Sequence, residues 1–184
     1  MEDLTLTVLI NLFGASSSGK STLMADLFSE MKLRGILVEM CTEWVKKWAW
    51  EGYVPSGYDQ FYIIGKEIKQ QARLFNKVDY IISDSPVYIS SFYKYYHTGV
   101  DNLTQTVREF YKMAKEDGIT VKNFFLTRNK PFEPKGRYQT EEESNAIADK
   151  LLLYLDMNDI KFEMLDCKDR DRVKEVFKAI GIKW

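Results

Sequence analysis

The chain has 184 residues, of which 45% are hydrophobic and 14% aromatic, so it can bury a substantial core. Its 26 lysines and arginines nearly balance 27 aspartates and glutamates, and the formal net charge of -1 argues against a protein that coats duplex nucleic acid. Because no apolar run reaches the roughly 18–20 residues of a membrane span and the acidic N-terminus does not resemble a signal peptide, we expect one cytoplasmic domain, residues 1–184.

Five apolar segments alternate with segments of helical periodicity. Strands are predicted at residues 4–13, 36–40, 78–84, 121–127 and 160–165, where β-branched and apolar residues cluster. Helices are predicted at residues 20–33, 58–75, 87–96, 103–116 and 140–157, with a last helix around Val173, Val176, Phe177 and Ile180. Thr140 and Glu143 form a capping-box pattern that is expected to start the 140–157 helix. This alternation predicts an α/β three-layer domain with a mainly parallel sheet of five strands.

The turn after the first strand reads Gly-Ala-Ser-Ser-Ser-Gly-Lys-Ser, which is the Walker A or P-loop pattern G-x-x-x-x-G-K-S. Small residues let successive backbone N–H groups surround a phosphate chain, and the helix N-terminus adds positive partial charge. Lys20 should reach the β- and γ-phosphates of ATP, and the Ser21 hydroxyl should coordinate Mg²⁺. The predicted nucleotide-binding residues are Gly14, Ala15, Ser16, Ser17, Ser18, Gly19, Lys20, Ser21 and Thr22.

Asp84 ends the buried segment VDYIISD and is the candidate acid for the magnesium ion. The carboxyl ends of parallel strands lie at the edge of the sheet where ligands bind, so Asp84 should emerge beside the P-loop. Its predicted role is a metal or catalytic carboxylate, with Ser21 and Asp84 together as the metal residues. The alternative is a simple strand-end turn, since Asp-Ser-Pro favours one.

An acid and several aromatic residues follow the second predicted strand in the stretch TEWVKKWAWEG. Glu43 could accept the proton of an acceptor hydroxyl or bind the acceptor's sugar; the alternative is a helix N-terminal acid that complements the helix dipole. Trp44, Trp48, Trp50 and Tyr53 either pack a helix against the sheet or form a stacking wall for a base or nicotinamide ring.

Residues 128–139 contain two prolines, a glycine and two arginines, and we predict a mobile lid there. Arg128 and Arg137 would approach the transferred phosphoryl group as its charge develops, and Arg137 is the stronger candidate because it lies just before the next helix. The alternative is a solvated basic loop.

His97, Cys41 and Cys167 are interpreted as residues without a catalytic role. The single histidine lacks visible partners for a metal or a catalytic triad. The two cysteines lie far apart without metal-ligand spacing, so they are expected to be reduced packing residues.

In these features the chain resembles small P-loop kinases. It is most similar to the AAA-type ATPase/kinase group that includes the nicotinamide riboside kinase domain of bacterial NAD regulators and standalone bacteriophage kinases. The resemblance rests on GASSSGKST, TEWVKKWAWEG, YDQFYIIGKEIKQQARLF, IISDSP followed by YKYY, and GRYQTEEE. It implies a sheet order of 2-3-1-4-5, ATP as the donor and Mg²⁺ as the cofactor. The resemblance also implies functional roles for Lys20, Ser21, Asp84, Glu43 and Arg137.

Two departures leave the acceptor open. The chain shows no adenylyltransferase or DNA-binding segment like those of the larger regulators. It has Asp-Ser-Pro where many deoxynucleoside kinases have an acid–arginine doublet.

The predicted function is transfer of the γ-phosphoryl group of ATP·Mg to a nucleoside, a nucleotide or a nicotinamide riboside-like acceptor. Two alternatives remain: a kinase that acts on a modified base or an end in DNA, and a P-loop ATPase switch without a small acceptor. We expect a monomer or homodimer in a bacterial cell or a phage-infected host.

Overall fold

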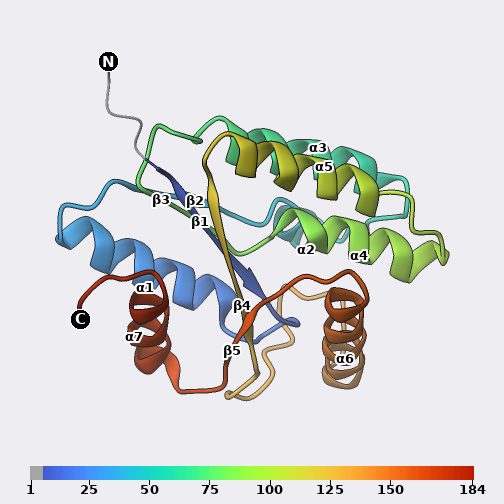
Figure 1. Cartoon of the computed structure of the whole chain (residues 1–184). Coiled ribbons are helices and arrows are strands. Elements are labelled where there is room, and N and C mark those ends of the chain that lie inside the picture. Colours follow the sequence, from blue (N-terminus) through green and yellow to red (C-terminus); the bar gives the residue numbers. More distant parts are fainter. Residues whose placement is uncertain (1–5) are drawn as a thin grey trace.

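A computed structural model describes residues 6–184 and contains one five-stranded sheet (Figure 1). The strands are β1 (Val8–Phe13), β2 (Val38–Cys41), β3 (Tyr80–Ser83), β4 (Thr120–Leu126) and β5 (Glu163–Leu165). Their order is β2-β3-β1-β4-β5, and each neighbouring pair is parallel. The predicted α/β class, parallel sheet and strand order are therefore confirmed.

Helices cover both faces of this sheet, which gives the three predicted layers (Figure 1). The helices are α1 (Lys20–Leu33), α2 (Lys46–Trp50), α3 (Asp59–Ala72), α4 (Val87–Thr98), α5 (Thr104–Glu116), α6 (Glu141–Met157) and α7 (Asp169–Ala179). The α1 and α7 side chains share one apolar cluster with the sheet, while α3, α4, α5 and α6 contribute to clusters on the other side. Within residues 6–184, we find no helix with the length and apolar character needed to cross a bilayer.

The central position of β1 in the sheet explains why its sequence is apolar almost throughout. Ile10 and Leu12 belong to the cluster under α1 and α7, whereas Leu9 and Phe13 belong to clusters on the opposite face. Because helices cover both faces, neither set of alternating side chains can be polar without a partner. The Asn11 side-chain nitrogen meets this condition by donating to Asn123 Oδ1 at 2.9 Å, whereas the buried Asn11 Oδ1 has no partner among residues 6–184.

Several predicted boundaries are wrong, and local hydrogen bonds explain one of them. The first strand begins at Val8 instead of residue 4, and residues 4–5 lie outside the described part of the chain. The last strand begins at Glu163 instead of residue 160 because the Ile160 N–H donates to the Leu155 carbonyl at 2.9 Å and so closes α6. The short helix α2 was not predicted at all.

Two further predictions concern local structure. The capping box that opens α6 is present in full: the Thr140 hydroxyl accepts from the Glu143 N–H, and the Glu143 carboxylate accepts from the Thr140 N–H. Cys41 is buried, Cys167 is half-buried, and both are free thiols.

We predict that Leu27→Ala lowers the free energy of unfolding by about 2–5 kcal/mol, because it removes a fully buried side chain from the cluster between α1 and the sheet. Leu33→Ala on the same helix is the control, since Leu33 is 82% exposed and its loss should change stability by no more than about 0.5 kcal/mol. Urea unfolding of both variants measures the difference. Equal destabilisation would contradict this assignment of the core.

Candidate functional site

The turn between β1 and α1 forms a tight loop whose backbone requires glycine at its first position. Gly14 has φ 139°, and a Cβ there would lie 2.7 Å from the Leu126 carbonyl oxygen of β4. Ser17 and Gly19 also have positive φ values, 62° and 92°. Helix α1 then begins at Lys20, so its free N–H groups face the concave side of the loop. This is the arrangement of an anion-binding nest at a helix N-terminus.

The Lys20 side chain lies over this loop. Its Nζ donates to the carbonyl oxygens of Gly14 at 2.8 Å and Ala15 at 3.0 Å. Burial lowers the pKa of Lys20, and the nearby carboxyls of Glu43 and Asp84 partly oppose that change. The ammonium therefore sits in a poorly solvated position where a phosphate oxygen could replace either carbonyl as its partner.

Asp84 connects three segments at the carboxyl edge of the sheet. It directly follows β3 and is 4% exposed. The Ser21 hydroxyl donates to its Oδ2 at 2.7 Å, and the Glu43 backbone N–H donates to its Oδ1 at 2.9 Å. Neighbouring oxygen ligands of an octahedral Mg²⁺ lie about 3 Å apart, since each metal–oxygen distance is about 2.1 Å. The Ser21 and Asp84 oxygens fit that spacing, so this pair could hold one magnesium ion.

Arg172 of α7 binds the backbone of the P-loop, a role that the sequence analysis did not predict. It is 1% exposed, and its guanidinium donates to the backbone carbonyls of Ser18 at 2.8 Å, Cys167 at 3.0 Å, and Thr127. These contacts join the P-loop to the segments that follow β4 and β5. The only sequence signal was a charged residue next to the apolar residues of the last helix.

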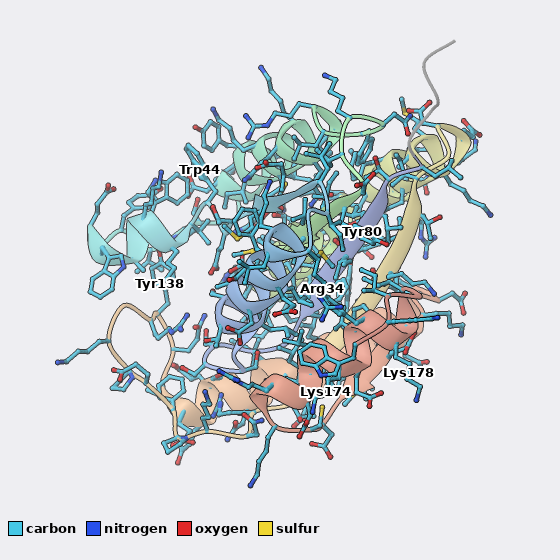
Figure 2. All side chains as sticks on the ribbon, turned by 90° about the vertical axis from the view of Figure 1, so that its left-hand side faces the viewer. Arg34, Trp44, Tyr80, Tyr138, Lys174 and Lys178 are labelled. Atoms are coloured by element: carbon cyan, nitrogen blue, oxygen red, sulfur yellow. The ribbon has the colours of Figure 1, made fainter. Side chains whose placement is uncertain are left out.

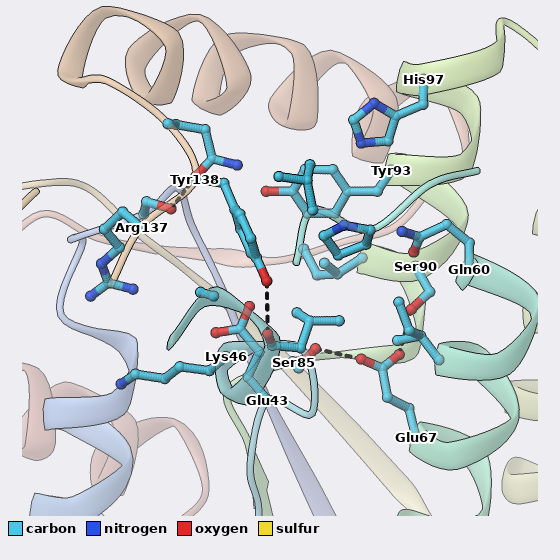
Figure 3. Close-up of a pocket in the computed structure, with 18 of the residues that line it drawn as sticks. Glu43, Lys46, Gln60, Glu67, Ser85, Ser90, Tyr93, His97, Arg137 and Tyr138 are labelled. Atoms are coloured by element: carbon cyan, nitrogen blue, oxygen red, sulfur yellow. Dashed lines mark hydrogen bonds between the residues drawn. The ribbon is translucent and has the colours of Figure 1, made fainter. Parts of the chain in front are cut away.

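A cavity lies beside the P-loop, bounded by α3, α4, the loop after β2 and the loop before α6 (Figure 3). Glu43 and Lys46 lie on one side of it with Arg137, and Gln60, Tyr93 and His97 lie across from them. Burial raises the pKa of Glu43, with the Lys20 ammonium opposing this and the Asp84 carboxylate adding to it. The charges of the predicted residues Lys20, Asp84, Glu43 and Arg137 thus act on one another, and Glu43 and Arg137 line the cavity.

Glu67 of α3 forms part of the opposite wall, and it too was missed. It is 4% exposed; Ser85 Oγ donates to its Oε1 at 2.5 Å and Ser90 Oγ donates to its Oε2 at 2.7 Å (Figure 3). Burial raises the pKa of Glu67 to about 8, although both hydroxyls favour the ionised form. The available signal in the sequence was the spacing of this acid: Glu67 lies four residues after Ile63 and three after Ile64, on the same buried face of the helix.

Arg128 holds the start of the 128–139 loop against the P-loop. Its Nη2 donates to the Ser16 carbonyl at 3.0 Å and to Ser144 Oγ at 2.5 Å, and its Nη1 lies 3.3 Å from the Glu141 carboxylate. Its guanidinium also lies 5.0 Å from the centre of the Phe132 ring. Both terminal nitrogens of this guanidinium therefore already have hydrogen-bond partners within the protein.

The end of the same loop closes over the cavity. The Tyr138 hydroxyl donates to the Val45 carbonyl at 3.0 Å (Figure 3), and a Cβ on Gly136 would lie 2.7 Å from the Trp50 ring. The buried Nε of Arg137 has no hydrogen-bond partner among residues 6–184. The loop therefore has polar and aromatic contacts with both the P-loop and α2, more than its sequence suggested.

The aromatic cluster after β2 packs locally and does not line the cavity. Trp48 packs on Tyr53 and Tyr62, with ring centres 5.3 Å and 6.2 Å apart. Instead, Tyr93 and Tyr138 provide the aromatic surface of the cavity. His97, which was interpreted as structural, lies in the cavity wall and stacks on Tyr93 at 6.0 Å.

Solved structures with similar folds include kinases. A crystal structure of NadR protein in complex with NR aligns with a TM-score of 0.71 and 15% identity, covering 97% of this chain and 53% of that one. Deoxyadenosine kinase from M. mycoides, with dCMP and dCDP bound, aligns with a TM-score of 0.62 and 16% identity over 94% and 98% of the two chains. APE1195 aligns with a TM-score of 0.55 and 16% identity over 96% of each chain.

At these identities the likeness shows a common fold, and the chain spans about half of the NadR protein. No curated protein matches the chain in sequence. A family model described as an AAA domain matches residues 9–172, which include the P-loop, Asp84 and Arg172. The chain therefore belongs to the AAA domain family, with the fold of a P-loop NTPase.

Proposed function

We propose that this protein transfers the γ-phosphoryl group of ATP to a hydroxyl of a nucleoside-like acceptor. The observation that carries the proposal is the position of Glu43: its backbone N–H binds Asp84 at the foot of the P-loop, while its side chain lines the neighbouring cavity. A nucleotide on the P-loop and an acceptor in the cavity would thus meet at one residue. The similar folds of NadR and deoxyadenosine kinase support an acceptor of this class.

The donor half follows from the P-loop. Residues 14–22 would bind the phosphate chain of ATP through backbone N–H groups, and Lys20 would exchange its carbonyl partners for β- and γ-phosphate oxygens. Ser21 and Asp84 would hold Mg²⁺, which would supply positive charge that neutralises the phosphates. These residues mainly position the phosphate chain and neutralise its charge.

In the acceptor half of the reaction, Glu43 is the residue that would accept the proton of the acceptor hydroxyl. The acceptor oxygen forms a bond to the γ-phosphorus, the bond from that phosphorus to the β–γ bridging oxygen breaks, and ADP leaves. Glu43 would accept the hydroxyl proton, which requires the carboxyl to be ionised beforehand. Burial raises the pKa of Glu43 and so opposes this state, whereas the nearby Lys20 ammonium favours it. Arg137 in the 128–139 loop, which we propose acts as a lid, would balance charge on the transferred group, and Arg128 would anchor that loop to the P-loop.

Measurements of ATP turnover with and without an acceptor distinguish a kinase from a P-loop switch. A P-loop switch hydrolyses ATP without an acceptor, whereas a kinase hydrolyses it slowly and transfers label to one acceptor class. The cavity favours the kinase, because a switch has no need for an enclosed site beside the γ-phosphate.

The direct test is a screen of nucleosides, nucleotides, nicotinamide riboside and DNA with labelled ATP. Lys20→Ala should reduce transfer at least about a hundredfold because it removes the buried ammonium from the phosphate site. Lys178→Ala, an exposed position on α7, is the control and should retain activity. Wild-type turnover by Lys20→Ala would contradict the proposal.

Asp84→Asn should sharply lower the maximal rate and raise the Mg²⁺ concentration needed for half-maximal activity. The amide keeps the shape of the side chain but lacks the charge that would attract the metal. A magnesium titration of the rate measures both effects. If the titration and the maximal rate are unchanged, Asp84 is only a structural acceptor for Ser21 and the Glu43 N–H.

Arg137→Ala should lower the transfer rate about 10²–10³-fold while weakening ATP binding much less, because a lid arginine acts on charge that develops in the transition state. Lys135→Ala is the matched control, an exposed cation in the same loop. Rate and ATP-binding measurements on both variants separate the effects. Similar small losses in the two variants would show a general effect of loop charge.

Glu67, in the wall of the cavity, should make the free energy of unfolding depend on pH. Its folded-state pKa of about 8 exceeds the ordinary value of 4.5, so the folded protein binds this proton more tightly than the unfolded chain. Wild-type stability should therefore fall relative to Glu67→Gln as pH rises from 4.5 to 8, by at most about 1.4 kcal/mol per pH unit. Above pH 8 the difference should level off.

Urea unfolding of both proteins between pH 5 and 9 measures this difference. A constant difference across the range would show that Glu67 is ionised throughout and that its two serine donors outweigh its burial.

A further inference from the structure

A second hollow lies on the other side of Glu43 from the cavity, between the loop after β2 and helix α3. Besides Glu43 and Trp44, its lining includes four exposed cations. These are Lys47, Lys66, Lys69 and Arg73.

The cations form a continuous stripe. Lys66 and Lys69 lie on α3 and Arg73 is its C-cap residue; their spacing of three and four residues places them on one face of the helix. At 1.5 Å per residue, the stripe extends about 10 Å along the helix. This is longer than a single phosphate needs, and Lys47 adds a fourth charge from α2.

The four cations outnumber the acids in this hollow, whose lining includes one carboxylate, that of Glu43. Among residues 6–184, none of the four forms an ion pair with a carboxylate. Lys47 and Lys66 converge on the Trp44 ring, with their Nζ atoms 5.0 Å and 5.3 Å from its centre. The ring attracts both ammoniums but leaves their mutual repulsion in place, and an anion bound between them would relieve it.

The hollow lies next to the proposed acceptor site, because Glu43 lines both of them. Figure 2 shows Trp44 on the side of the molecule where Tyr138 lies, away from Lys174 and Lys178. A nucleoside in the cavity would thus have a row of cations beside it, positioned to meet phosphates attached to that nucleoside.

We propose that this hollow binds the phosphodiester backbone of a single-stranded nucleic acid, so that the acceptor nucleoside enters the cavity as part of a strand. The inference rests on the proposed function, because the cavity must accept a nucleoside. A small basic groove suits a single strand and agrees with the near-neutral charge of the whole chain, which disfavours a broad duplex surface.

The test is binding of a fluorescein-labelled ten-nucleotide deoxythymidine strand to the full chain, followed by anisotropy at several salt concentrations. The test variant replaces Lys47, Lys66, Lys69 and Arg73 with Gln. Each lost phosphate contact should reduce the slope of log K against log salt by about 0.7, so four contacts account for up to about 2.8. Affinity at low salt should fall at least tenfold.

The control variant replaces four other exposed lysines with Gln and changes the net charge equally. They are Lys77, Lys115, Lys161 and Lys178. It should keep wild-type affinity and most of the salt slope. Equal weakening in both variants would overturn the proposal, because it would reflect only net charge. Deoxythymidine monophosphate that binds as tightly as the strand would also overturn it.

ATP·Mg binding and transfer to free nucleosides, measured on the same proteins, distinguish this proposal from the proposed function. If the wild type binds ATP and phosphorylates a nucleoside but does not bind the strand, only the strand site is wrong. If it neither binds ATP nor transfers phosphate, the proposed function is wrong. Both variants should bind ATP·Mg as the wild type does, since none of the substituted residues lies in the P-loop.

Discussion

The carboxylate of Asp84 is the contact on which the arrangement of the site depends. One of its oxygens accepts from Ser21 at the start of α1, and the other accepts from the Glu43 N–H after β2. A buried carboxylate is costly unless such donors satisfy it, so these hydrogen bonds fix the P-loop and the Glu43 loop to the end of β3. The parallel order β2-β3-β1 makes this possible because it places the three strand ends side by side.

This junction also concentrates negative charge before any nucleotide arrives. Asp84 and Glu43 lie close enough to raise the pKa of Glu67, and Asp84 also raises that of Glu43. Lys20, Arg137 and Lys46 are the nearby cations that oppose this effect at Glu43. A phosphate chain would add further negative charge, so positive charge beyond that of these three side chains would favour its binding. We infer that a divalent cation at Ser21 and Asp84 makes the site electrostatically acceptable to ATP.

Much of the fold could be predicted because its signals are local. The apolar run of β1, the glycine–lysine turn and the Thr140–Glu143 capping box are each contained in a short segment. Arg172 and Glu67 could not be placed from sequence, because their roles depend on distant partners. Arg172 binds the Ser18 carbonyl from 154 positions away, and only the packing of α7 beside α1 brings them together. Glu67 similarly depends on serines that α4 and its preceding turn supply.

The two arginines of the 128–139 loop look equivalent in sequence, but their surroundings differ. Arg128 already donates to Ser16 and Ser144, so moving its guanidinium to a phosphate would cost these hydrogen bonds. The buried Nε atoms of both arginines lack a partner in the described chain, but only Arg137 lines the cavity, where it lies on the same side as Glu43. A buried unsatisfied donor is destabilising in the free protein and becomes favourable when an anion accepts from it. We infer that Arg128 anchors the loop and that Arg137 is the arginine positioned for the transferred group.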